Sequence, residues 1–84
     1  MTLELQVAQL IQEVILESTG REVTVAAEDR IVETGLLDSL SMVNVVMALQ
    51  RTFDVDVDIT DLNEETFGSA ASIATLVRSR KPGR

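Results

Sequence analysis

The sequence contains no cysteine, histidine, tryptophan or tyrosine, and it has one proline and only two phenylalanines. Without cysteine or histidine the chain can form no disulfide, no thiolate nucleophile, no Ser–His or Cys–His relay and none of the usual zinc sites. We therefore predict a protein that is not an enzyme, with no catalytic residue and no metal ligand. No apolar run approaches the ~18 residues of a membrane span, and the N-terminus lacks the pattern of a secretory signal, so we expect a cytoplasmic protein.

The chain has 84 residues, of which 45% are hydrophobic, and this composition predicts one folded domain with a compact, mainly aliphatic core. We expect a single domain over residues 1–84, with an ordered core over about 3–80 and a short tail over 81–84. The net charge is −7, and four of the seven basic residues lie in the last seven positions. Such an acidic body disfavours nucleic acid and membrane partners and favours proteins with basic patches. We expect a monomer.

Apolar residues recur at helical spacing in three segments, which predicts an all-α fold of three main helices and one short one. The first expected helix spans 3–18, with Thr2 as its N-cap and Gly20 as its stop. The second runs from Ser39 to Thr52 or Phe53, and a short helical turn follows near Asp61–Thr66. The last spans roughly 70–80, capped by Ser69 and ended by Pro82-Gly83. The connection from 20 to 38 is unusually long. Within it, Val23–Val25 has no partner strand, and we expect Ile31, Leu36 and Leu37 to anchor the segment in the core.

The predicted helix that begins at Ser39 has apolar residues on two nearly opposite faces. The larger face holds Met42, Val45, Val46, Leu49 and Phe53, and the smaller one holds Leu40, Val43 and Met47. A small domain cannot easily bury both faces of one helix, so the smaller face indicates a surface that meets a partner or shelters an apolar group. The alternative is that the long connection folds over it.

Asp38 and Ser39 lie where the long connection meets this helix. A phosphate attached to Ser39 would be stabilised by the helix dipole and by free amide hydrogens. Either residue is also a common N-cap, and the dipeptide alone favours that simpler interpretation.

The longer string Thr34-Gly-Leu-Leu-Asp-Ser-Leu40, followed by Val43, Val46-Met-Ala-Leu49 and Phe53, resembles the attachment motif of acyl and peptidyl carrier proteins. The resemblance extends over roughly residues 5–78 and implies a four-helix carrier bundle. It implies that a phosphopantetheinyl transferase attaches 4′-phosphopantetheine from coenzyme A to Ser39, with Asp38 as a contact for that transferase. It also implies that Leu40, Val43 and Met47 touch partner enzymes.

In such carriers the arm holds an acyl or aminoacyl group as a thioester. The implied partners are therefore a loading ligase or synthase and a downstream transferase or condensing enzyme. Fatty-acid carriers resemble one another in an acidic second helix, whereas the matching positions here are Ser41, Asn44, Gln50, Arg51 and Thr52. We therefore hypothesise a specialised pathway, such as polyketide, nonribosomal peptide or amino-acid loading. A housekeeping fatty-acid carrier is one alternative, and a helical interaction module without a covalent arm is another.

The acidic segment after this helix partly matches a calcium-binding EF-hand loop. Asp54, Asp56, Asp58, Thr60 and Glu65 fall at positions 1, 3, 5, 7 and 12 of that loop. Ile59 replaces the glycine that makes its sharp turn, however, so we expect no specific calcium site.

Overall fold

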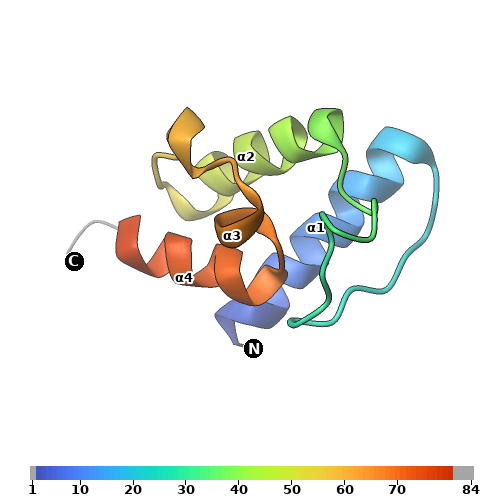
Figure 1. The fold of residues 1–84 in the computed structure, drawn as a ribbon, viewed down its shortest axis with the longest axis horizontal. Helices are drawn as coiled ribbons and strands as arrows, with labels where there is room; N and C mark the ends of the chain where they lie inside the picture. Colours follow the sequence, from blue (N-terminus) through green and yellow to red (C-terminus); the bar gives the residue numbers. More distant parts are fainter. Residues whose placement is uncertain (1, 81–84) are drawn as a thin grey trace.

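A computed structural model describes residues 2–80 (Figure 1), and these residues contain helices and no strand. In chain order the elements are α1 (Leu3–Thr19), α2 (Ser39–Phe53), the 3-10 turn η1 (Ile59–Asp61), α3 (Glu64–Phe67) and α4 (Ala70–Arg80). The predicted all-α class, with three main helices and a short one, is confirmed. The predicted tail, including Pro82 and Gly83, lies outside the described residues, and the single domain over the whole chain stays a prediction.

Helix α1 begins and ends at the residues that the sequence predicts as caps. The Leu5 backbone N–H donates to the Thr2 hydroxyl at 3.2 Å, which satisfies one of the free amides of the first turn. At the other end Gly20 has a φ of +76°, and its N–H donates to the Leu16 carbonyl at 2.8 Å. A glycine adopts this left-handed conformation without strain, so α1 stops there.

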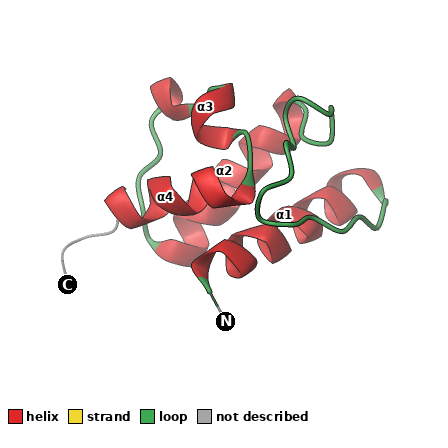
Figure 2. Ribbon diagram, turned by 60° about the horizontal axis from the view of Figure 1, so that its bottom comes forward, coloured by secondary structure: helices red, strands yellow, loops and turns green. Residues whose placement is uncertain are grey.

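Helix α1 is the element against which both other long helices pack. Figure 2 shows α1 along the lower edge of the molecule, with α4 above it and α3 at the top. The buried side chains of α1 are Val7, Ala8, Leu10, Ile11, Val14 and Ile15. Val45 and Leu49 of α2, Phe67 of α3 and Ile73 of α4 meet them in the core, and each of these four is fully buried. The core is mainly aliphatic, as the composition predicts.

The connection from 20 to 38 forms no regular element but is attached to the rest of the fold at several points. Ile31 and Leu37 are buried and Leu36 is half-buried against the core, so all three predicted anchors are confirmed. The Ile31 N–H donates to the Gly68 carbonyl at 2.8 Å, and the Ala27 carbonyl accepts from the Ala71 N–H at 2.8 Å. These two bonds tie the connection to the junction between α3 and α4.

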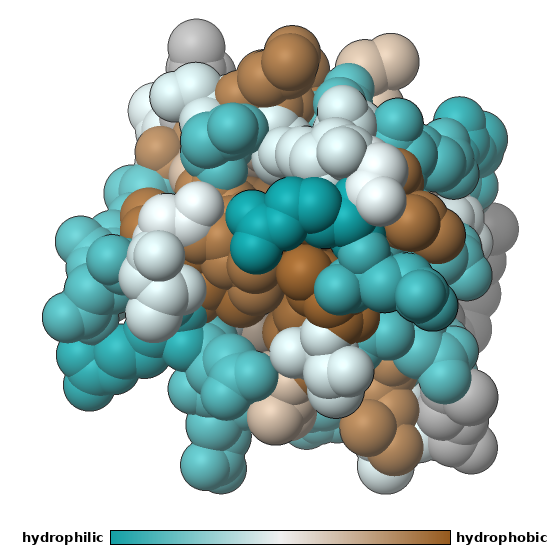
Figure 3. All heavy atoms as spheres, turned by 90° about the vertical axis from the view of Figure 1, so that its right-hand side faces the viewer, coloured by the Kyte–Doolittle hydropathy of each residue, from teal (hydrophilic) through white to brown (hydrophobic). Residues whose placement is uncertain are grey.

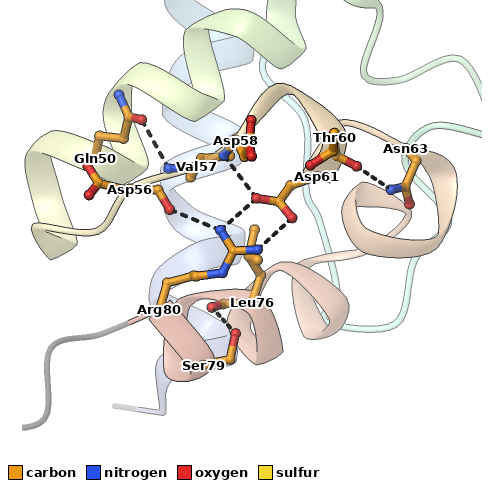
Figure 4. A network of polar contacts seen from close by, with 10 residues as sticks. All are labelled: Gln50, Asp56, Val57, Asp58, Thr60, Asp61, Asn63, Leu76, Ser79 and Arg80. Carbon is orange, nitrogen blue, oxygen red and sulfur yellow. Dashed lines mark hydrogen bonds and ion pairs between the residues drawn. The ribbon is translucent and has the colours of Figure 1, made fainter.

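A cluster of polar contacts joins the acidic segment after α2 to the end of α4 (Figure 4). The Arg80 guanidinium donates to both carboxylate oxygens of Asp61 at 2.8 Å, and Asp61 also accepts from the Asp58 backbone N–H at 2.9 Å. The Asp61 side chain is only 12% exposed. The hydrogen bond from Arg80, followed by the one from Asp58, lowers the pKa of Asp61 below its ordinary value. Arg80 therefore stabilises the fold by joining the end of α4 to this segment. Arg78 of α4 forms a more exposed ion pair, at 2.9 Å, with Glu4 of α1.

Replacing Arg80 with Gln should lower the free energy of unfolding at pH 7. It should also reduce the amount of this free energy that is lost in acid. Because the folded-state pKa of Asp61 is lowered, this pair contributes stability above the ordinary pKa of about 3.8, and the contribution is lost as pH falls through the lowered value. Urea unfolding at a series of pH values from neutral to strongly acidic measures both effects. Arg51→Gln removes the same charge from a residue that forms no ion pair within 2–80. Equal behaviour of the two variants would contradict the prediction.

Candidate attachment site at the start of α2

Asp38 is the residue that starts α2. Its backbone is extended, with φ −89° and ψ −178°, and its carboxylate accepts from the Ser41 backbone N–H at 2.8 Å. The Asp38 carbonyl accepts from the Met42 N–H at 2.8 Å, which is the first bond of the helix. Hydrogen bonds from the Ser41 backbone and then from its hydroxyl lower the pKa of Asp38. Of the two residues that the sequence allows as the N-cap, the cap is therefore Asp38.

Ser39 is the first residue of α2, and its side chain is exposed. Its hydroxyl forms no hydrogen bond with any residue from 2 to 80 and is free to carry a substituent. Ser41, two residues later, is only 3% exposed. A phosphate on Ser39 would lie at the positive end of the α2 dipole, near amide hydrogens that have no partner within the helix. Ser39 thus fits a phosphodiester, whereas the buried Ser41 does not.

The two-faced character of α2 is confirmed. Leu40 is 70%, Val43 48% and Met47 58% exposed, and we call these three residues the docking stripe, after the partner contact that the resemblance predicts for them. The opposite face packs into the core, with Val45 and Leu49 fully buried. The connection from 20 to 38 does not cover the docking stripe, so that alternative is wrong.

The face that carries the long connection is mainly hydrophilic (Figure 3). Apolar atoms are exposed at its top, at the level of α2 in Figure 1, and in a hollow near its centre. The apolar surface therefore lies among polar side chains, which is typical of a surface that meets other proteins in solution.

The acidic segment differs from an EF-hand loop. Residues Ile59–Asp61 form a 3-10 turn, and Asp61 is held by Arg80. Among residues 2–80, no group of three or more acidic side chains is arranged to hold a metal ion. Within the same part of the chain, no helix is long and apolar enough to cross a membrane.

Residues 7–77 match the protein family described as the phosphopantetheine attachment site. The chain belongs to this family. The match includes the exposed Ser39, its cap and the docking stripe, and it confirms the resemblance seen in the sequence. The protein is thus a carrier protein with covalently attached 4′-phosphopantetheine as its cofactor. Carriers of this family are not catalytic in themselves, and they interact with a phosphopantetheinyl transferase and with the enzymes that load them.

Relatives of the carrier include D-alanyl carrier proteins and a probable acyl carrier protein. The D-alanyl carrier protein of Lactobacillus acidophilus is 28% identical over 71 residues, which are 84% of this chain and 90% of the relative. The D-alanyl carrier protein of Lactobacillus helveticus is 27% identical over 71 residues, again 84% and 90% of the two chains. A probable acyl carrier protein of Caulobacter vibrioides is 36% identical over 62 residues, or 73% of this chain and 72% of the relative.

One feature beside the site is absent from the sequence prediction. A groove of about 530 Å³ runs between α1 and α2, and Met47 of the docking stripe forms part of its wall. Glu13 and Glu17 of α1 line the same groove. Their spacing of four residues places them on one face of α1. Their position next to Met47 depends on how α1 packs against α2, which the sequence pattern does not contain.

We expect Asp38→Ala to destabilise the carrier and Asp38→Asn to have little effect at neutral pH, because asparagine caps a helix about as well as aspartate does. The lowered pKa of Asp38 means that its contribution is present above the ordinary value of 3.8 and is lost as pH falls through the folded-state value. The Asn variant should therefore lose less stability in acid than the wild type. Urea unfolding at neutral and acid pH measures this, and an Asn variant as unstable as the Ala variant would refute it.

Proposed function

We propose that Ser39 carries the phosphopantetheine arm and that the protein presents an acyl or aminoacyl thioester on this arm to partner enzymes. The observation that carries the proposal is the exposed Ser39 hydroxyl, without a hydrogen-bond partner within 2–80, at the first residue of α2. In the attachment step the Ser39 oxygen loses its proton and bonds to the phosphorus of coenzyme A that bears the pantetheine. The bond from that phosphorus to the adenosine bisphosphate breaks, and this group leaves.

The chain's own residues position the arm and perform no catalysis in this proposal. Asp38 holds the first turn of α2 in place by accepting from the Ser41 N–H, so the Ser39 oxygen points from a rigid helix end. The positive end of the α2 dipole stabilises the phosphodiester charge. The docking stripe, Leu40, Val43 and Met47, gives a partner enzyme an apolar surface that begins at the residue after Ser39 and extends a little over two turns along α2. Asp38 is also proposed as a contact for the transferase, since it is exposed and directly precedes Ser39 in the chain.

The cargo that the observations favour is an aminoacyl group. Two relatives that align over 84% of the chain are D-alanyl carrier proteins, although their identity to this chain is below 30%. Helix α2 carries no acidic residue and one basic residue, Arg51, which disfavours the acidic docking surface of fatty-acid carriers. We therefore propose a dedicated carrier in a specialised pathway, loaded by an amino-acid ligase and working in the cytoplasm. An acyl group is the second candidate for the cargo, because one relative, from C. vibrioides, is named a probable acyl carrier protein.

Incubation with coenzyme A, magnesium and a broad-specificity phosphopantetheinyl transferase should add one phosphopantetheine to the wild-type chain and none to Ser39→Ala. Intact mass measures the addition, and Ser79→Ala, which changes another exposed serine, should be modified like the wild type. No mass gain, or an equal gain in Ser39→Ala, would favour the interaction module without an arm. Asp38→Asn keeps the cap, so slower modification of that variant would identify its carboxylate as a transferase contact.

The modified protein should accept D-alanine from a D-alanine-activating ligase and ATP, with a mass gain that is lost on mild thioester cleavage. The matching experiment offers it to general fatty-acid synthase enzymes, which should use it far less well than their own carrier, because α2 lacks the acidic residues that pair with basic patches. Equal turnover with those enzymes would refute the specialised role and favour the housekeeping alternative.

A further inference from the structure

The groove between α1 and α2 is open to solvent and lies directly beside the docking stripe. Its apolar lining includes Leu10 and Val14 of α1 and Ala48 of α2, which are buried in the core. Asn44 of α2 also lines the groove, and its side-chain amide donates to the Ser18 hydroxyl of α1 at 3.0 Å, which links the two helices there. The groove thus combines buried apolar residues with exposed polar side chains from both helices.

The two carboxylates of the groove form no ion pair with another residue from 2 to 80. Glu13 and Glu17 are both exposed and lie one helical turn apart, so their like charges repel each other. Neither forms an ion pair with any residue from 2 to 80, and Arg51, which lines the same groove, is not paired with them. Glu4 and Asp61, by contrast, are paired with Arg78 and Arg80. A cation from outside the chain would relieve the repulsion at Glu13 and Glu17.

Met47 joins the groove to the docking stripe. Its side chain is 58% exposed, and it belongs both to the apolar face of α2 and to the wall of the groove. A protein surface that covers Leu40, Val43 and Met47 therefore extends to the rim where Glu13 and Glu17 lie. Apolar contact at Met47 would remove water from the neighbouring carboxylates and strengthen their attraction to a cation.

We propose that the docking surface of this carrier extends from the docking stripe across the groove onto α1, and that the amino-acid ligase that loads it places a lysine or arginine against Glu13 and Glu17. This inference rests on the proposed function, since it names how the loading partner is recognised. It moves the acidic part of the recognition surface from α2 to the neighbouring helix, where the carboxylates act beside Met47. A second copy of the chain would be repelled, because it would bring the same two carboxylates to the contact. An anionic membrane would be repelled for the same reason.

The test compares two double variants that remove the same charge. Glu13→Gln/Glu17→Gln neutralises the groove, and Glu28→Gln/Glu65→Gln neutralises two exposed carboxylates in a separate hollow between the long connection and α3–α4. The probe is a D-alanine-activating ligase, with its affinity for the full-length carrier measured by calorimetry and its loading rate by intact mass. Both are recorded at low and high salt.

We expect the groove variant to lose roughly tenfold in affinity and in kcat/KM at low salt, and to lose most of the salt dependence that the wild type shows. The control variant should change by less than about twofold, because exposed charges away from the contact are screened. Equal behaviour of the two double variants, or a wild-type carrier that does not bind this ligase, would overturn the inference.

The same binding experiment on Ser39→Ala separates this inference from the proposed function. Docking through the groove does not need the arm, so the Ser39→Ala chain should bind the ligase with the same sensitivity to Glu13→Gln/Glu17→Gln. If the wild type fails to gain phosphopantetheine but still binds through the groove, the attachment at Ser39 is wrong and the docking inference holds. If Ser39 is modified but Glu13→Gln/Glu17→Gln has no effect on binding, the attachment at Ser39 holds and the docking inference is wrong.

Discussion

Burial of one apolar face of α1 is the constraint on which the rest of this small fold depends. Helix α1 lies between α2 and α4, and its buried residues are the largest contribution that one element makes to the core. Because that core has room for only one face of α2, the side of α2 that holds Val45 and Leu49 turns inward. Leu40, Val43 and Met47 are left outside as a consequence of packing, with no separate device to expose them. The surface that we propose for docking is thus produced by the limited volume of the core.

The sequence predicted the helices well because their signals are local. Thr2, Gly20 and Ser69 act as caps or stops where their side chains or backbone conformations favour it, and the apolar spacing of α2 separates its two faces without knowledge of the rest. The identity of the α2 cap was open because Asp38 and Ser39 both suit the position. The bond between Asp38 and the Ser41 N–H decides it, and that bond depends on the direction from which the long connection enters the helix.

Contacts between distant segments were beyond the sequence pattern. The pair of Arg80 and Asp61 joins residues that are 19 positions apart, and nothing in the spacing of charges selects Asp61 from the other carboxylates of its segment. The position of Glu13 and Glu17 beside Met47 depends in the same way on the packing of α1 against α2. Charge counts along single helices therefore underestimate the acidic surface beside the docking stripe, because part of it belongs to a different helix.

The hydrogen bonds from the long connection to the start of α4 have a consequence for the order in which the site is completed. The residues before α2 are anchored through Ile31 to Gly68 and through Ala27 to Ala71, and α1 packs against α4. During synthesis, a nascent chain that has emerged only as far as α3 lacks Gly68 and Ala71, and so it has neither of these anchors and no α4 for α1 to pack against. The connection that leads into Asp38 and Ser39 is then not held in place. Both anchors of the connection that leads into the site can therefore form only after the first turn of α4 has been synthesised.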